Sequence, residues 1–144
     1  MIQKTYRFLL IITFLVLLGS TVSAQIETNN WFFGKNAGID FNDNLVTILS
    51  DGAMFTPAGC SSISDKNGNL LFYTNGLQVW NGNHQIMSGS TEQVADIKGN
   101  QPALIVPKPN DENVYYIFST IEDYIMTPHA MAPGVYYAEV VFSY

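Results

Sequence analysis

The chain has 144 residues, with six Lys and Arg against twelve Asp and Glu, and a formal net charge of −6. Such an acidic surface repels phosphate backbones and anionic lipids, which argues against nucleic acid and membrane surfaces as partners. The single cysteine, Cys60, cannot form a disulfide within the chain, so we expect packed sheets rather than disulfides to supply the stability.

Residues 1–24 have the three-part pattern of a secretory signal peptide. Lys4 and Arg7 precede the uncharged segment FLLIITFLVLLG, and VSA supplies small residues before a cleavage site at Gln25. An uncleaved membrane anchor is the alternative, but it needs roughly 20 apolar residues, more than this segment holds. We therefore expect export, cleavage, and a mature chain of residues 25–144 without a membrane span.

Short apolar runs separated by Gly, Asn, Asp and Pro recur through the mature chain, and no segment has the period of an amphipathic helix. This pattern predicts an all-β fold. In chain order, the expected strands are residues 31–33, 39–41, 46–49, 61–64, 70–74, 77–80, 103–107, 114–120 and 135–141.

The clearest predicted hairpin is CSSISDKNGNLLFYT, in which residues 65–69 separate two apolar runs. Gly68 can adopt the positive φ that a tight reversal requires. A second turn at Asn75 and Gly76 leads into LQVW, so three strands are expected to form a meander.

A second unit, PALIVPKPNDENVYYIFSTIED, repeats this arrangement around a polar loop at residues 109–113. Asp65 of the first loop and Asp111 of the second lie 46 residues apart, which is close to the roughly 40 to 50 residues of a propeller blade. The sequence therefore predicts a partial β-propeller of about one and a half to two blades. Between the units, NGNHQIMSGSTEQVADIKGNQ is expected to be a long surface connection with one short strand at 85–87.

Three segments carry a resemblance to a known family: NNWFFGKNAGIDFN, CSSISDKNGNLLFYTNGLQVWNGNHQIM and QPALIVPKPNDENVYYIFST, in this order after a signal peptide. Over about residues 29–120 the chain resembles the N-terminal, propeller-like region of Bacteroidota exported proteins that end in a gliding-motility-associated sorting domain. The resemblance implies type IX secretion and a secreted or outer-surface location. It transfers no catalytic residues.

The chain departs from that family because it ends at Tyr144 with no sorting domain. Propellers usually close with 4 to 8 blades, and 120 mature residues supply at most about three blades of roughly 40 residues. An open stack leaves strand edges and a sheet face exposed. We therefore expect a truncated domain, a fragment of a longer protein, with self-association as the alternative.

Asp65, Asn67 and Asn69 place oxygen-bearing side chains at alternate positions, as calcium loops do. A full calcium loop also needs Gly at its sixth position and Glu at its twelfth, where this chain has Leu70 and Gly76. Asp and Asn also favour such turns through hydrogen bonds to their own backbone. We favour a structural turn and predict no metal or cofactor.

Several aromatic side chains can form a platform for sugar rings, but aromatic residues also dominate ordinary sheet cores, and we favour core packing. The loop WNGNH, ending at His84, is the best candidate for an exposed recognition loop. The aromatic residues concerned are Trp31, Phe32, Phe33, Trp80, Tyr115 and Tyr116.

The sequence contains no recognisable catalytic constellation. Cys60 as a nucleophile needs a base, and His84 and His129 lie in no known motif, so we expect a buried, inert thiol. The sequence has no phosphate-binding Gly loop and no nucleophile elbow. We expect a non-catalytic binding or adhesion module for a polysaccharide or another surface protein. The alternative is part of a propeller glycoside hydrolase or lyase whose catalytic residues lie outside this chain.

Overall fold

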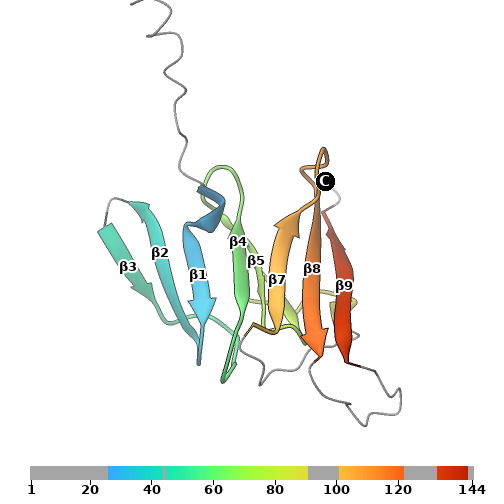
Figure 1. Ribbon diagram of the computed structural model, residues 1–144. Coiled ribbons are helices and arrows are strands. Elements are labelled where there is room, and N and C mark those ends of the chain that lie inside the picture. Colours follow the sequence, from blue (N-terminus) through green and yellow to red (C-terminus); the bar gives the residue numbers. More distant parts are fainter. Residues whose placement is uncertain (1–25, 44, 91–100, 122–132, 143–144) are drawn as a thin grey trace, which may run out of the picture.

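The computed structural model describes residues 26–43, 45–90, 101–121 and 133–142. Within these ranges the chain forms nine β-strands and one short 3-10 helix, η1 (Ile26–Thr28), but no α-helix. The strands form three antiparallel sheets of three strands each, and within each sheet neighbouring strands are consecutive in the chain (Figure 1). The predicted all-β class is confirmed, whereas the predicted one and a half to two sheets are too few.

The first sheet accounts for this difference. It consists of β1 (Asn30–Phe33), β2 (Ala37–Asp43) and β3 (Leu45–Leu49). The sequence predicts these strands, but the β1–β2 reversal does not resemble DKNGN: it uses Gly34 and Asn36, with φ of 60° and 57°. Glycine and asparagine reach this left-handed region at low cost. A repeat defined by DKNGN-like loops therefore leaves this sheet uncounted.

The middle sheet is the predicted meander. It consists of β4 (Ser61–Ser64), β5 (Leu70–Thr74) and β6 (Val79–Asn81). Both reversals contain a glycine with positive φ, Gly68 at 85° and Gly76 at 89°. The predicted turn chemistry at these positions is confirmed.

The outer strand of the middle sheet differs in detail from the prediction. β6 begins at Val79 rather than at Leu77, because the backbone N–H groups of Leu77 and Gln78 donate to Asn75 Oδ1 within the turn (3.0 and 2.9 Å). The short strand predicted at residues 85–87 is present only as an isolated bridge between Trp80 and Ile86. Much of the long connection that follows lies outside the described residues.

The third sheet consists of β7 (Ala103–Pro107), β8 (Val114–Ile121) and β9 (Gly134–Val141). β8 pairs along its whole length with β9. Asn110, in the loop between β7 and β8, has a φ of 64°. The connection from β8 to β9 lies in residues 122–132, outside the described part of the chain.

The middle sheet packs against both of the others, so both of its faces are buried. Phe72 and Tyr73 are adjacent on β5, and successive residues of a strand point to opposite faces. Tyr73 stacks on Phe32 of the first sheet, with ring centroids 4.7 Å apart. Phe72 meets Tyr115 of the third sheet edge to face at 5.6 Å. The core toward the first sheet comprises Phe32, Met54, Tyr73 and Trp80, and the core toward the third sheet comprises Ile63, Phe72, Val79, Ala103, Ile105, Tyr115, Ile117 and Val140.

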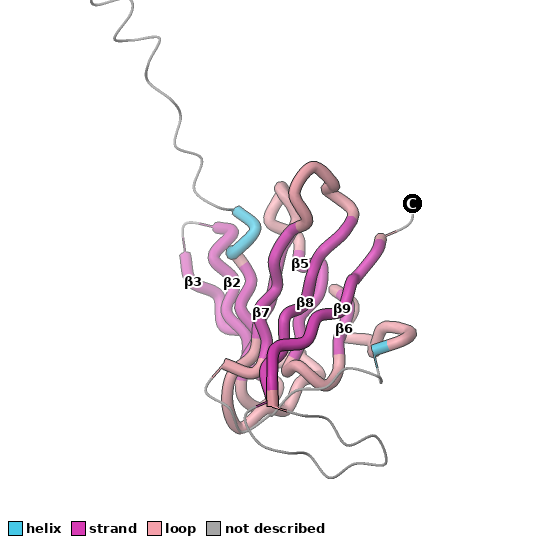
Figure 2. The backbone as a smooth tube through the Cα atoms, turned by 45° about the vertical axis from the view of Figure 1, so that its right-hand side comes forward, coloured by secondary structure: helices cyan, strands magenta, loops and turns pink. Residues whose placement is uncertain are grey.

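The first strands of the three sheets, β1, β4 and β7, lie next to one another (Figure 1). Serine hydroxyls link them. Ser62 Oγ donates to Asn30 O at 2.7 Å, and the backbone N–H of Ile105 donates to Ser61 Oγ at 3.2 Å. The strands of all three sheets lie along roughly the same axis, with β1 pointing opposite to β4 and β7, and the turns gather at the two ends of the molecule (Figures 1 and 2).

Candidate functional site

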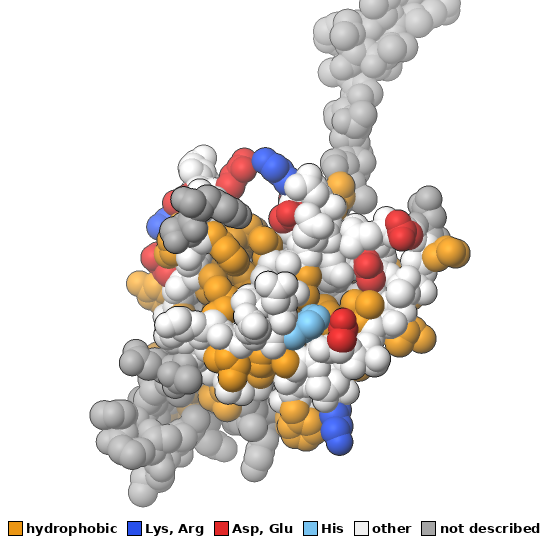
Figure 3. Space-filling view, turned by 180° about the vertical axis from the view of Figure 1, so that it is seen from behind, with side chains coloured by type: hydrophobic (Ala, Val, Ile, Leu, Met, Phe, Trp, Pro, Cys, Tyr) orange, Lys and Arg blue, Asp and Glu red, His pale blue; other side chains and the backbone are white. Residues whose placement is uncertain are grey.

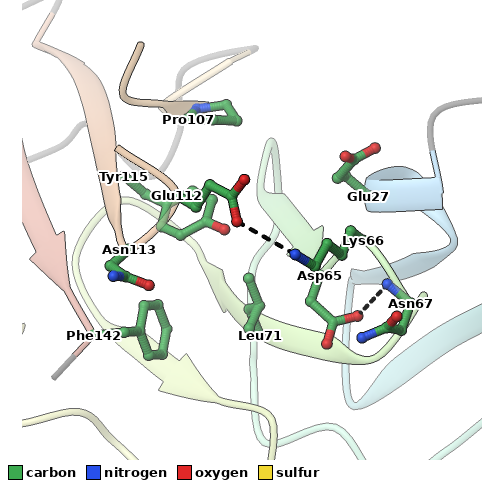
Figure 4. Close-up of a pocket in the computed structure, with 10 residues that line it drawn as sticks. All are labelled: Glu27, Asp65, Lys66, Asn67, Leu71, Pro107, Glu112, Asn113, Tyr115 and Phe142. Atoms are coloured by element: carbon green, nitrogen blue, oxygen red, sulfur yellow. Dashed lines mark hydrogen bonds and ion pairs between the residues drawn. The ribbon is translucent and has the colours of Figure 1, made fainter. Parts of the chain in front are cut away.

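A cleft of about 560 Å³ lies where the turns of two sheets approach each other. It is bordered by η1, the β4–β5 turn, the loop between β7 and β8, and the end of β9 (Figure 4). These elements lie far apart in the chain, and the packing of the middle sheet on the third sheet brings them together. The lining residues are Glu27, Asp65, Lys66, Asn67, Leu71, Pro107, Glu112, Asn113, Tyr115 and Phe142.

The aromatic part of the lining is held firmly. Tyr115 and Phe142 meet edge to face at 6.0 Å, and Phe142 also contacts Phe72 at the same centroid distance. The backbone N–H of Phe142 donates to Asn113 O at 2.9 Å, which fixes the end of β9 against the start of β8. The cleft therefore presents apolar ring surface whose position is set by the core behind it.

An ion pair links the two turns that border the cleft. Lys66 Nζ lies 3.4 Å from Glu112 Oε2, and both side chains are highly exposed (76% and 86%). Such an exposed pair contributes little to stability. The two loops that the sequence identifies as repeats thus lie opposite each other across the cleft.

Asp65 organises its own turn. Its Oδ1 accepts hydrogen bonds from the backbone N–H groups of Asn67 (2.8 Å) and Asn69 (2.9 Å), and its Oδ2 accepts from Asn69 Nδ2 (3.0 Å). Burial raises the pKa of Asp65, but the hydrogen bonds from Asn69 and Asn67 outweigh burial, so the pKa lies below its ordinary value. This geometry supports the structural-turn interpretation. Within the described residues, no group of three or more His, Cys, Asp or Glu side chains lies close enough together to hold a metal ion.

The same turn is attached to the first sheet. The carbonyl oxygen of Gly68 accepts hydrogen bonds from Asn30 Nδ2 (2.7 Å) and Asn42 Nδ2 (2.9 Å). A Cβ added to Gly68 would overlap the Asn42 side chain. The edge of the cleft formed by the β4–β5 turn is thereby held in place from behind.

The six aromatic residues considered as a sugar platform do not share one face. Core packing, the favoured interpretation, is confirmed for Phe32, Trp80 and Tyr115, which are buried. Trp31 and Phe33 lie instead on the exposed face of the first sheet. Of the six, only Tyr115 lines the cleft.

His84 belongs to a polar network that the sequence does not reveal. Its Nδ1 lies 3.0 Å from Tyr73 Oη, and its Nε2 lies 3.5 Å from Asp51 Oδ2. The space-filling view shows a histidine side chain at the surface beside an acidic one (Figure 3). Tyr73 Oη accepts a hydrogen bond from the backbone N–H of Ala53 (2.9 Å), which leaves its own proton for Nδ1. A neutral His84 with its proton on Nε2, toward the accepting carboxylate of Asp51, fits this arrangement.

This network restricts the loop that we considered for recognition. The His84 side chain is only 23% exposed, and Trp80 is buried. Asn81 Oδ1 accepts from the backbone N–H groups of Asn83 and Gln85 and so closes the turn. Burial raises the pKa of Tyr73, an effect opposed by the Ala53 hydrogen bond and reinforced by the charge of Asp51. WNGNH is therefore a turn held by its own hydrogen bonds, in which His84 and Trp80 pack inward.

Cys60 is partly buried, with its Sγ 3.2 Å from Phe32 O. Burial raises the pKa of this thiol, which disfavours the nucleophilic thiolate. Of the two histidines considered as bases, His84 is engaged by Tyr73 and Asp51, and His129 lies outside the described residues. The arrangement fits the predicted inert thiol.

Comparison with known proteins found no matching family model, no similar curated protein and no similar solved structure. The resemblance to Bacteroidota exported proteins therefore remains a prediction. Among the described residues, no helix is long and apolar enough to span a membrane.

Proposed function

We propose that this chain is a non-catalytic binding or adhesion module of an exported, β-propeller-type protein, and that the cleft beside Tyr115 binds its ligand. The cleft carries the proposal, because it combines fixed aromatic surface with polar side chains from two different sheets. Binding sites commonly join an apolar lining to a few convergent polar groups. Secretion and an outer-surface location belong to the proposal through residues 1–24 and the family resemblance.

Three features support a propeller-type arrangement. Each sheet is a meander of consecutive strands, the sheets stack face to face, and their first strands adjoin one another. Propeller blades are small antiparallel sheets arranged around a common axis. On this proposal, β1, β4 and β7 are the strands nearest the axis, and the cleft lies at one end between two successive blades.

The ligand proposed first is a neutral or cationic polysaccharide. The half-buried ring of Phe142, backed by the buried ring of Tyr115, suits the apolar faces of sugar rings, and the amides of Asn67 and Asn113 suit hydroxyl groups. The cleft also has more carboxylates than amines, which disfavours anionic chains. A protein segment with the same chemistry is the other partner class.

Calorimetric titration with a neutral glucan, a cationic chitosan and an anionic alginate tests this proposal. We expect binding to the first or second, weakened about tenfold by Asn113→Ala, which corresponds to about 1.4 kcal/mol. Asn83→Ala is the matched control, because Asn83 lies in the β6 turn outside the cleft lining. A folded protein that binds none of the three polymers would contradict the polysaccharide assignment.

A propeller glycoside hydrolase or lyase is the second candidate. One observation favours it: the carboxylates of Glu27, Asp65 and Glu112 line the same cleft. A general acid in such enzymes needs a raised pKa, whereas the hydrogen bonds at Asp65 lower its pKa despite burial. Release of new reducing ends from a bound polysaccharide would support the enzyme, and binding without turnover supports the module.

A further inference from the structure

The first sheet has an uncovered apolar face. Its covered face contains Phe32, which stacks on the middle sheet, so the alternate residues point the other way. Trp31 is 52% exposed and contacts Phe41 edge to face at 5.4 Å. Ile48 is 83% exposed and shares this face, because Ile39 pairs with both Trp31 and Ile48.

The third sheet has a second uncovered apolar face, opposite the core that contains Ile117. Leu104, Phe118 and Tyr137 form one cross-strand row on it. All three are exposed, Tyr137 to 68%. Tyr116 packs against Phe118 and Tyr137, with ring centroids 6.0 and 6.1 Å away. Both ends of the stack therefore carry the residue types that the middle sheet buries at its two interfaces.

The two uncovered faces are turned toward the same side of the molecule. The first and third sheets spread to either side of β4 in Figure 1, and the rest of the middle sheet lies behind. The middle sheet covers the rear face of each neighbour. One body in front of the molecule can therefore cover both faces at once.

We propose that this body is a second copy of the chain. Related by a two-fold axis, the second copy lays its third sheet on the first sheet shown here and its first sheet on the third sheet. Each contact joins the first sheet of one copy to the third sheet of the other. Two such contacts cover all four apolar faces, so none remains exposed for a third copy to bind. The result is a closed ring of six sheets, within the 4 to 8 of known propellers.

The size of the contact suits a stable dimer. Three strands spaced about 4.8 Å apart and about five residues long present a face of roughly 14 by 17 Å. Four such faces amount to about 1,000 Å² as flat areas, without the additional surface of the side chains. Specific protein–protein interfaces bury about this area or more. Large exposed apolar patches on an exported protein mark interaction sites of this kind.

Light scattering on the purified full chain, after whatever processing it undergoes on export, tests the proposal. We expect twice the mass of one chain over a wide concentration range. A monomer at every concentration, or an open-ended series of larger species, overturns it. Loss of polysaccharide binding in a protein that still dimerises would count against the proposed function alone.

Charged substitutions identify the faces. Trp31→Glu and Tyr137→Lys alter exposed positions, so each variant is expected to fold, as circular dichroism melts can verify, but to dimerise at least about tenfold more weakly. Asn83→Glu, on a turn outside both faces, is the control that should still dimerise. A dimer unaffected by both face substitutions overturns the proposal.

A mixing experiment tests the pairing of first sheet with third sheet. In a mixed dimer of Trp31→Glu with Tyr137→Lys, one contact holds both substitutions, with opposite charges, and the other contact is unaltered. We therefore expect the mixture to recover dimers that neither variant forms alone. If each variant alone is monomeric and the mixture is monomeric too, the two faces do not pair as proposed.

Discussion

Phe72 and Tyr73 are neighbours on β5 and both are fully buried, yet their side chains enter different cores. Phe72 packs toward the third sheet and Tyr73 toward the first. The middle sheet is therefore a shared layer, and neither neighbouring sheet reaches the other's core. Substitutions of Phe72 and of Tyr73 should report on different interfaces, because the two side chains have no ring partner in common.

Tyr73→Phe should destabilise the protein while leaving the ring stacking intact. The substitution removes the acceptor of the Ala53 N–H and the partner of His84 Nδ1. We expect a loss of about 1 to 3 kcal/mol in the free energy of unfolding, the usual cost of leaving such groups unsatisfied. Urea denaturation measures it, with Asn83→Ala on an exposed turn as the control. Equal stability of both variants would show that the network contributes nothing.

Gly68→Ala should destabilise the β4–β5 turn for two separable reasons. The φ of 85° costs a residue with a Cβ about 1 to 2 kcal/mol, and the new Cβ overlaps the Asn42 side chain. The same substitution in an Asn42→Ala background should retain the backbone cost but lose the overlap. A double-mutant cycle of unfolding free energies measures the difference. An absence of coupling between positions 42 and 68 would contradict the close contact.

The strands and tight turns could be predicted from the sequence because their signals are local. Gly68 and Gly76 punctuate apolar runs of strand length, and both have the positive φ that the turns require. The number of sheets could not be read in the same way. Gly34 and Asn36 make an equivalent reversal from different residues, so the first sheet lacks the signature that identified the other two.

The packing of the sheets on one another could not be predicted from the sequence, for a different reason. Both faces of β5 are covered, so Phe72 and Tyr73 break the alternation of apolar and polar residues that identifies a buried face. The contacts of His84 with Asp51 and Tyr73 depend on that packing, and no local sequence motif predicts these contacts. The cleft did have a signal: the similar loops around Asp65 and Asp111 lie side by side because the sheets that carry them stack.

Added calcium should leave the melting temperature unchanged. The carboxylate oxygens of Asp65 already accept hydrogen bonds from Asn67 and Asn69. A ligand that binds only the folded state must raise the melting temperature in proportion to its occupancy. Thermal melts by circular dichroism with calcium and with a chelator test this. A clear upward shift that Asp65→Asn abolishes would establish a calcium site.

Export should remove residues 1–24. The mature chain is then expected to begin at Gln25 or at its cyclised pyroglutamate form, because the small residues of VSA precede this position. Intact-mass spectrometry of the exported protein measures the N-terminus. Ala24→Leu should prevent cleavage there, since a bulky residue replaces a small one. An intact Met1 in exported wild-type protein would contradict the prediction.

The hydrogen bonds at Asp65 make a prediction about acid stability. Burial raises its pKa and the bonds from Asn69 and Asn67 lower it, with a net decrease from the ordinary value of 3.8. The folded state therefore binds this proton less readily than the unfolded state, so the ionised carboxylate stabilises the fold above the unfolded pKa. That stabilisation is lost as the pH falls through the folded pKa. Asp65→Asn should accordingly be less stable than wild type at neutral pH, and the difference in unfolding free energy should shrink in strong acid. A difference that stays constant across this range, measured by urea denaturation at each pH, would show that the charge of Asp65 contributes nothing to the turn.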